Sequence, residues 1–497
     1  MCVLQFLVNG FTMVMASAVI RILLLWFNVY ISNCLGENGM GIFTLLMTVL
    51  SFAQGVATSG LSLAATRIVS EELAINCELG AKRAVKKCLT FALLLSVLLS
   101  SVVWIFAPLI GTVVLKGEAP FELVRALALC FPGLTFSSVF SGYFIAVRKA
   151  YKSSFVQIAE VAVRVLCSML LMKLLLPKGV AYGCLALILA SVVSEGISFA
   201  VNLALYLNDK KRLINFKSGE HLTSRVFKIA LPVVLSSMLK SALSSVKQIV
   251  IPTGLVLYGF SKKRAISDFG LMNGMVIPII LFPYAIIGAV ASLTVPEIAS
   301  RHIRGNRQRI NDIIVLLIKN VFIFSLFVCG VLFCYGEELG ITLYRSIKAG
   351  RYITLLAPLV LLMYMDTVTD SILKGIDKQV TVVKINIFDT LLCIALIYLL
   401  VPKAGLTGYI AVLYISELLN LILSMGTLYR EYKFKIDIYK IFIKPSFAMI
   451  VGLEFVKYTS PTPIRGFLLM FFIYLSLLII FGCFRVKPFK IREVVVK

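Results

Sequence analysis

The sequence predicts an all-α, polytopic membrane protein with about fourteen transmembrane helices. The chain has 497 residues, of which 60% are hydrophobic, and its mean hydropathy is +0.98. A soluble domain is only about half apolar. The apolar residues recur in stretches of roughly 20 along the whole chain, and a helix of that length crosses the hydrocarbon core of a bilayer.

The expected spans follow from these stretches. The first of them lacks a basic leading segment and a cleavage site, so we expect an uncleaved span rather than a signal peptide. In chain order, the spans are expected at about 8–32, 41–66, 88–115, 121–147, 154–176, 181–207, 229–258, 267–296, 310–335, 352–373, 380–401, 406–429, 441–457 and 466–484.

The longest hydrophilic connection, residues 208–228, divides these spans into two sets of six followed by a final pair. This arrangement is typical of transporters built from internal repeats. We therefore expect two pseudo-symmetric lobes and two additional helices. The expected parts are an N-lobe (1–207), a cytoplasmic linker (208–228), a C-lobe (229–430), a helix pair (431–485) and a basic cytoplasmic tail (486–497).

The charged residues predict the orientation. The 49 Lys and Arg residues exceed the 24 Asp and Glu residues by 25, and most bases lie in short loops on one side of the expected membrane. By the positive-inside rule, both termini are expected in the cytoplasm, in a cell membrane. The loop at 262–264 is an exception to this trend. No basic run interleaved with aromatic residues suggests a nucleic-acid partner.

Histidine and cysteine offer little chemistry. The 11 cysteines contain no CxxC pair, and there are only 2 histidines, so we expect no metal site and no cofactor. The longest outer loop, about 336–351, offers two glutamates and some bases. A membrane enzyme is therefore not expected, and we expect a monomer.

Polar residues inside two expected spans suggest a binding cavity. A charge at the centre of a bilayer costs at least about 2.5–3.5 kcal/mol, so it is expected to face a cavity or a partner. Arg21 shares one helix face with Ser17 and Asn28 in the first span. The seventh span carries a wider polar face at helical spacing. Its members are Ser237, Lys240, Ser241, Ser244, Lys247 and Gln248.

Two lysines separated by two helical turns suit an anionic ligand such as a phosphate. The alternative is that the small residues pack one helix against another and that the lysines extend toward the membrane surface.

Acidic residues suggest a coupling site in the tenth span. Asp366 and Asp370 lie one turn apart and are candidates for binding Na⁺ or carrying protons, unless Lys374 neutralises Asp370. Glu160 and Arg164 are expected to form an ion pair along their own helix. Several other acids within spans, among them Glu195, Asp389 and Glu417, are expected to be isolated.

Four segments resemble a known family. The segment 35–43, LGENGMGIF, resembles a turn of polysaccharide exporters. The segment 58–72, TSGLSLAATRIVSEE, and the glycine and prolines of 274–298 resemble the second and eighth spans of the stage V sporulation protein B group. The segment 366–408 resembles its tenth to twelfth spans. The chain thus resembles the polysaccharide biosynthesis branch of the multidrug/oligosaccharidyl-lipid/polysaccharide exporter superfamily, which is related to lipid II flippases.

This resemblance implies two six-helix lobes in a V, and flipping of an undecaprenyl-pyrophosphate-linked oligosaccharide or peptidoglycan precursor. It also implies that Arg21 matches an arginine facing the cavity. A second basic residue of the family is absent, since Trp26, Phe27 and Val29 occupy that region. Lys247 stands where relatives often have an acidic or polar residue.

The function expected from these features is a flippase for a lipid-linked oligosaccharide, working in the bilayer by alternating access. A Na⁺ or H⁺ gradient or the membrane potential would drive it. The alternatives are a cation-coupled multidrug antiporter of the same superfamily and a membrane assembly factor that transports nothing. The expected process is the assembly of the spore cortex or of a cell-surface polysaccharide.

Overall fold

The computed structural model describes residues 2–74, 78–210, 222–459 and 463–483. Helices account for most of these residues, turns and short connections account for the rest, and no β-strand occurs among them. The predicted all-α fold is therefore confirmed. Two predicted parts, most of the linker (211–221) and the basic tail (486–497), lie outside the described residues.

By its internal packing, the chain divides into two compact units. The first comprises residues 1–282 and 390–412, and the second comprises 283–389 and 413–497. The sequence predicts a different division, with the two lobes separated by the connection at 208–228. That boundary stays a prediction.

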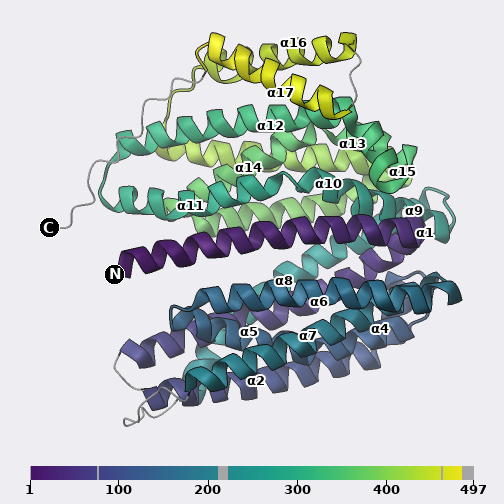
Figure 1. Cartoon of the computed structure of the whole chain (residues 1–497), viewed down its shortest axis with the longest axis vertical. Coiled ribbons are helices and arrows are strands. Elements are labelled where there is room, and N and C mark those ends of the chain that lie inside the picture. Colours follow the sequence, from purple (N-terminus) through teal and green to yellow (C-terminus); the bar gives the residue numbers. More distant parts are fainter. Residues whose placement is uncertain (1, 75–77, 211–221, 460–462, 484–497) are drawn as a thin grey trace. The chain divides into compact units, whose positions relative to one another are not determined.

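The helices of the first unit run from α1 to α10 (Figure 1). They are α1 (Cys2–Ala74), α2 (Glu78–Ile105), α3 (Ala107–Val114), α4 (Glu122–Leu127), η1 (Ala128–Cys130), α5 (Phe131–Ala146), α6 (Ala150–Leu175), η2 (Leu176–Lys178), α7 (Val180–Lys210), α8 (Leu222–Leu257), α9 (Lys262–Phe269), the π-helix η3 (Gly270–Val276) and α10 (Ile277–Leu281).

The second unit contains the remaining helices, apart from the middle of α15. They are α11 (Tyr284–Ile303), α12 (Arg307–Tyr344), α13 (Ile347–Leu356), α14 (Leu359–Gly375), α15 (Gln379–Tyr432), the π-helix η4 (Tyr439–Ile443), α16 (Lys444–Thr459) and α17 (Pro463–Ile480).

Two of the longest helices are each two segments joined at a glycine. Gly36 in α1 has φ 68° and ψ −177°, and Gly405 in α15 has φ 58° and ψ −134°. Glycine adopts this positive-φ backbone without the steric cost that a Cβ would add. Both breaks lie where the sequence predicted a connection between consecutive spans.

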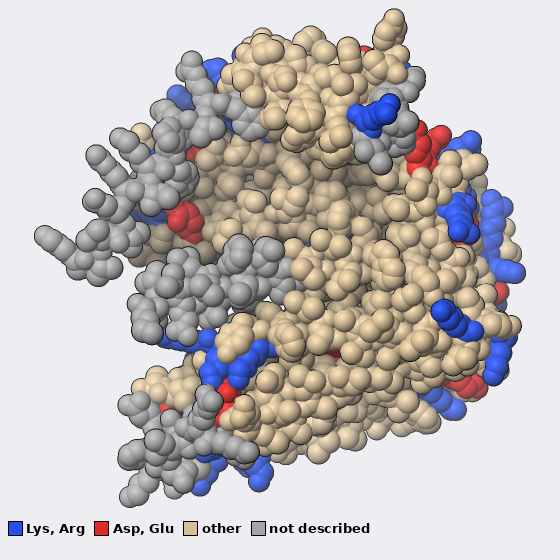
Figure 2. All heavy atoms as spheres, in the orientation of Figure 1, with Lys and Arg blue, Asp and Glu red and all other residues tan. Residues whose placement is uncertain are grey.

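Seven described helices are long and apolar enough to cross a membrane, and an eighth span arises if the bent pair α13 and α14 counts as one. Since α1 and α15 are among the seven, two of these helices contain a break. In the space-filling view, Lys and Arg side chains lie mainly near the edges of the face and neutral residues fill most of its middle (Figure 2). The polytopic membrane fold is confirmed, and the count of fourteen spans stays a prediction.

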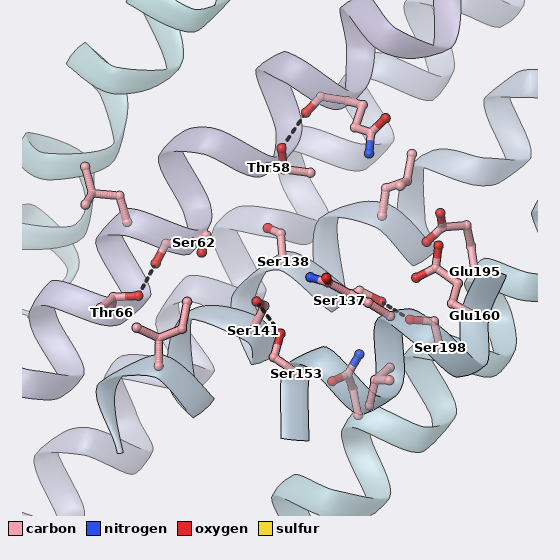
Figure 3. A pocket seen from close by; sticks show the side chains of 17 residues that line it. Thr58, Ser62, Thr66, Ser137, Ser138, Ser141, Ser153, Glu160, Glu195 and Ser198 are labelled. Atoms are coloured by element: carbon pink, nitrogen blue, oxygen red, sulfur yellow. Dashed lines mark hydrogen bonds between the residues drawn. The ribbon is translucent and has the colours of Figure 1, made fainter. Parts of the chain in front are cut away.

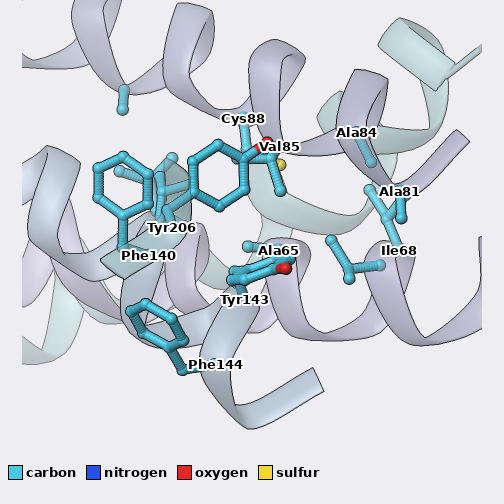
Figure 4. Close-up of a cluster of buried hydrophobic side chains, with 14 residues drawn as sticks. Ala65, Ile68, Ala81, Ala84, Val85, Cys88, Phe140, Tyr143, Phe144 and Tyr206 are labelled. Atoms are coloured by element: carbon cyan, nitrogen blue, oxygen red, sulfur yellow. The ribbon is translucent and has the colours of Figure 1, made fainter. Parts of the chain in front are cut away.

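The first unit has a core of buried side chains between α1, α2, α5 and α7 (Figure 4). Tyr206 of α7 packs edge-on against Tyr143 of α5, with ring centroids 4.9 Å apart. Its ring also lies 5.4 Å from that of Phe140. Ile68 of α1 and Val85 of α2 close the cluster. These contacts hold together α1, α5 and α7, which with α6 also enclose a polar cavity, described below.

In the second unit, the last two helices pack on α12 (Figure 1). Met449 of α16 and Tyr474 of α17 are buried there beside Ile323 of α12. The Tyr474 hydroxyl donates a hydrogen bond of 3.1 Å to the Ile323 carbonyl. The predicted additional helix pair is therefore an integral part of this unit.

Candidate functional site

The predicted polar face of the first span lies in the first segment of α1, before the Gly36 break. Ser17 and Arg21 are exposed, and Asn28 is half-buried. All three make polar or electrostatic interactions. The arginine therefore sits on an apolar helix with its side chain accessible, as a cavity-facing or lipid-facing residue would be.

The predicted polar face of α8 separates into two parts. One part contacts α1: Thr48 donates a hydrogen bond of 2.8 Å to Oε1 of Gln248, and Ser245 donates one of 3.4 Å to the Thr48 carbonyl. Ser241 packs so closely against Gly55 that an added Cβ there would lie 2.0 Å from its Oγ. Gln248 and Ser241 thus take part in packing α8 against α1.

The other part of that face is accessible. Lys240 and Ser244 are exposed, while Ser237 and Lys247 are half-buried. Lys247 acts electrostatically on the buried Tyr409, a residue of α15 in the same unit. The two lysines therefore have different surroundings, one open and one lined by protein.

A polar cavity of about 710 Å³, which the sequence did not predict, lies between α1, α5, α6 and α7 (Figure 3). Its lining hydroxyls come from all four helices and are those of Thr58, Ser62, Thr66, Ser137, Ser138, Ser141, Ser153 and Ser198. None of the residues predicted for the α1 and α8 faces lines it. One signal was available: Thr58, Ser62 and Thr66 follow each other at single-turn spacing, which places them on one face of α1.

Two glutamates lie at one end of this cavity, and one arginine bridges them. Arg164 Nη2 lies 2.6 Å from Oε1 of Glu160 and 3.1 Å from Oε1 of Glu195. Its Nε donates a hydrogen bond of 3.2 Å to Ser194. The predicted pair of Glu160 and Arg164 is confirmed. The expectation that Glu195 is isolated is wrong, because α7 brings it to the arginine from 31 positions further along the chain.

The predicted acidic pair of the tenth span lies on α14, in the second unit, and α15 supplies its partners. Asn420 donates a hydrogen bond of 3.1 Å to Oδ2 of Asp366. Asn386 and Ser424 donate bonds of 3.2 Å to Oδ2 and Oδ1 of Asp370. Both carboxylates are buried. The pair is therefore held by neutral donors from a helix that follows it in the sequence.

Two acceptor oxygens of this cluster, one on α14 and one on α15, lack a hydrogen-bond partner within the described part of the protein. Oδ1 of Asp366 and Oδ1 of Asn420 are buried and have no hydrogen-bond partner among the described residues. Two unsatisfied oxygens, one of them on a buried carboxylate, suit a proton or a small cation, since buried acceptors are normally paired. No group of three or more His, Cys, Asp or Glu in the described chain could hold a metal ion. A cation there would rely on amide and hydroxyl oxygens as well.

A nearby acid, Asp389, was also expected to be isolated, and this expectation is wrong. Its Oδ1 accepts a hydrogen bond from the Ser416 hydroxyl, which joins the two segments of α15 that belong to the second unit. Lys374, the residue proposed to neutralise Asp370, is exposed.

Comparison with known proteins decides the family. The sequence model described as "Polysaccharide biosynthesis protein" matches residues 6–286, more than half of the chain. The chain belongs to this family. It is 22% identical to stage V sporulation protein B of Bacillus subtilis over 464 residues, which cover 91% of this chain and 88% of that protein.

Solved structures of the same fold are membrane transporters. The lipid II flippase MurJ, in an inward closed conformation, matches with a TM-score of 0.71 at 13% identity, over 94% of this chain and 98% of that one. An inward-facing MATE family multidrug resistance transporter of the MOP superfamily matches with a TM-score of 0.67 at 16% identity, over 84% and 98%. This member of the polysaccharide biosynthesis family therefore has the fold of MOP-superfamily transporters.

Proposed function

We propose that the protein is a flippase that moves a lipid-linked oligosaccharide or peptidoglycan precursor, carried on undecaprenyl pyrophosphate, across the cell membrane by alternating access. The observation that carries the proposal is the pair of lysines on α8, with Lys240 exposed and Lys247 half-buried on an apolar helix. A cation in hydrocarbon is costly unless it meets water or an anion. A lipid pyrophosphate supplies that anion, and family membership supports the sugar it carries.

The residues have separate roles in this mechanism. Lys240, Lys247 and Arg21 bind the pyrophosphate, Lys as a point charge and Arg through a planar fork of donors. Four residues of the predicted site donate or accept hydrogen bonds around the pyrophosphate, namely Ser17, Asn28, Ser237 and Ser244, and the polyprenyl tail stays in lipid. The other two residues of the predicted site, Ser241 and Gln248, hold α8 against α1.

The driving force follows from the charge of the cargo. A headgroup that carries two negative charges is favoured to move outward across a membrane that is negative inside, by about 2.3 kcal/mol per charge per 100 mV. Asp366 and Asp370 would bind the proton or cation that returns the carrier to its starting state. In the proposed orientation both termini are cytoplasmic, and the protein acts as a monomer.

The test is flipping of fluorescent undecaprenyl-pyrophosphoryl-sugar in proteoliposomes. The wild type is compared with Arg21→Ala and Lys240→Ala/Lys247→Ala at equal reconstitution. Lys173→Ala is a matched control, because Lys173 is also exposed and basic but lies in the last turn of α6, outside the predicted site. Flipping that collapses in the site variants and persists in the control supports the proposal.

The other outcomes separate the alternatives. A folded wild type that flips no donor lipid refutes the flippase. Efflux of lipophilic cations by the same vesicles would then favour a multidrug antiporter. No transport of either kind would favour a membrane assembly factor.

A further inference from the structure

The polar cavity of the first unit has a composition that differs from that of the basic residues on α1 and α8. Its lining is made of hydroxyls, amides, a few apolar side chains and two glutamates, and no lysine or arginine belongs to it. Its volume of about 710 Å³ falls within the ~300–1,000 Å³ of ordinary small-molecule sites. The cavity therefore has room for a ligand larger than an ion.

Several hydroxyls of the cavity donate within the protein and can therefore accept a hydrogen bond from a ligand. Thr66 donates to the Ser62 and Gly142 carbonyls at 2.8 and 3.1 Å, and the Ser141 and Ser153 hydroxyls lie 2.8 Å apart (Figure 3). A hydroxyl has one proton and two lone pairs, so a hydroxyl that donates to the protein keeps lone pairs for a ligand. The amides Gln54 and Gln157 are exposed and add donors. A ligand with many hydroxyl groups matches this mixture.

The charges of the cavity disfavour the other ligand classes. Glu160 and Glu195 disfavour an anion such as pyrophosphate. Arg164 lies between the two carboxylates, at 2.6 and 3.1 Å, and neutralises much of their attraction for a cation. Apolar side chains, among them Leu134 and Val156, offer surface to the C–H faces of a sugar ring. What remains is an uncharged, hydroxyl-rich molecule.

We propose that the cavity between α1, α5, α6 and α7 binds the uncharged sugar of the lipid-linked substrate. The proposal rests on the proposed flippase function and places the sugar on residues other than those that bind the pyrophosphate. Helix α1 contributes to both sites, with Arg21 before the Gly36 break and Thr58, Ser62 and Thr66 after it.

The experiment measures binding rather than transport. The full-length protein in nanodiscs is titrated with neutral disaccharides (N,N′-diacetylchitobiose, cellobiose and maltose), with inorganic pyrophosphate and with tetraphenylphosphonium. Saturable binding of at least one disaccharide is expected, in the millimolar range typical of a small polar ligand that lacks its lipid anchor.

Variants locate the site. Ser141→Leu fills the cavity and is expected to weaken disaccharide binding at least tenfold. Ser137→Ala/Ser141→Ala is expected to weaken it about fivefold, since it removes two hydrogen-bonding groups without adding volume. The matched control is Ser191→Ala/Ser325→Ala. Both of these serines are buried, donate to their own helix backbone and do not line the cavity. This control is expected to leave binding unchanged.

Three results would overturn the proposal: no binding of any disaccharide, disaccharide binding unchanged in both cavity variants, or a cation that binds in place of the sugar and is lost in Glu195→Gln. Thermal unfolding of each variant shows that it is folded, and the double alanine variant serves if the leucine variant is not. Sugar binding without flipping would refute the proposed function and keep this site. Flipping without sugar binding would do the reverse.

Discussion

The hydroxyl of Thr48 donates a 2.8 Å hydrogen bond to the side chain of Gln248, across 200 positions of sequence. The bond joins the second segment of α1 to α8, the helix that begins the predicted C-lobe. Because both helices belong to the first unit, the polar face predicted for α8 is shared between packing and solvent. Residues on one side of that face stabilise the unit, while those on the other side remain available to a ligand.

The tightest point of that packing gives the first prediction. Gly55→Ala should lower the free energy of unfolding by about 1–3 kcal/mol, because the new Cβ would lie 2.0 Å from Ser241 Oγ. Ser241→Gly in the same chain should restore most of the loss, since it removes the obstructing atoms. The measurement is thermal unfolding of the purified protein in detergent.

Gly196→Ala is the matched control, because nothing lies within 4 Å of its added Cβ. It should be neutral or slightly stabilising, as alanine favours a helix over glycine. An equal loss of stability in both variants, or no rescue by Ser241→Gly, would contradict the close contact.

Much of the fold could be predicted from sequence because it depends on composition along single segments. Apolar stretches fix the helices, and the connection around Gly36 is visible as a glycine-rich motif. Periodicity also grouped Ser241, Ser244 and Lys247 on one face of α8. It could not say what that face touches, since the residue that bonds to it, Thr48, lies on another helix.

The cavity could not be predicted for the same reason. Each helix contributes only a few small hydroxyls, and such residues are common wherever membrane helices pack closely. Glu195 lies 31 positions from Arg164 and on a different helix, so local spacing gives no hint of their contact. Sites built from one helix are visible in sequence, whereas sites built from four need the packing.

The second prediction concerns an ion cluster at the end of α7, beyond the expected span. Lys152 Nζ lies 2.8 Å from both carboxylate oxygens of Asp209, and Lys149 Nζ lies 3.1 Å from Oδ1. Burial of the Asp209 carboxyl by itself raises its pKa, but hydrogen bonds and charges from Lys152 and Lys149 outweigh burial and hold the pKa below its ordinary value.

Asp209→Asn should therefore cost about 1–3 kcal/mol of unfolding free energy at neutral pH. A lowered native pKa gives stability that is present above the ordinary aspartate pKa of about 4 and is lost as pH falls through the native value. The difference between wild type and variant should thus shrink below about pH 4. Thermal unfolding across pH checks this.

Asp437→Asn provides the control for that experiment, since Asp437 also pairs with a lysine, Lys440, but its side chain is 47% exposed. Exposed pairs contribute little, so its effect should be much smaller. A loss of stability in Asp209→Asn that stays constant down to acidic pH would show that the charge of Asp209 is not the cause.

The third prediction tests ion coupling. Asp366→Asn keeps the shape of the side chain and removes the charge beside the unsatisfied Oδ1 of Asn420. Stimulation of flipping by an imposed Na⁺ or H⁺ gradient should fall about tenfold or more, equivalent to ~1.4 kcal/mol. Asp377→Asn, in the exposed turn after α14, should keep full stimulation. Full stimulation in the Asp366→Asn variant would show that the coupling ion binds elsewhere.

The last prediction asks whether Lys247 recognises charge. Lys247→Met keeps the apolar stem and removes the ammonium, so flipping of a lipid pyrophosphate should slow about tenfold, or ~1.4 kcal/mol in the barrier. The loss should be smaller for the same sugar on a lipid monophosphate, because one ammonium faces less negative charge.

Lys247→Arg should retain most of the flipping rate, since it keeps the positive charge. Lys384→Met, at an exposed position of α15, should leave the flipping rates of both lipids unchanged. The comparison of the two lipids separates charge recognition from a general defect, because a misfolded or poorly inserted variant would slow both equally. Equal loss with both lipids would assign Lys247 a packing role next to Tyr409, the residue on which it acts electrostatically. The pyrophosphate would then depend on Lys240 and Arg21 alone.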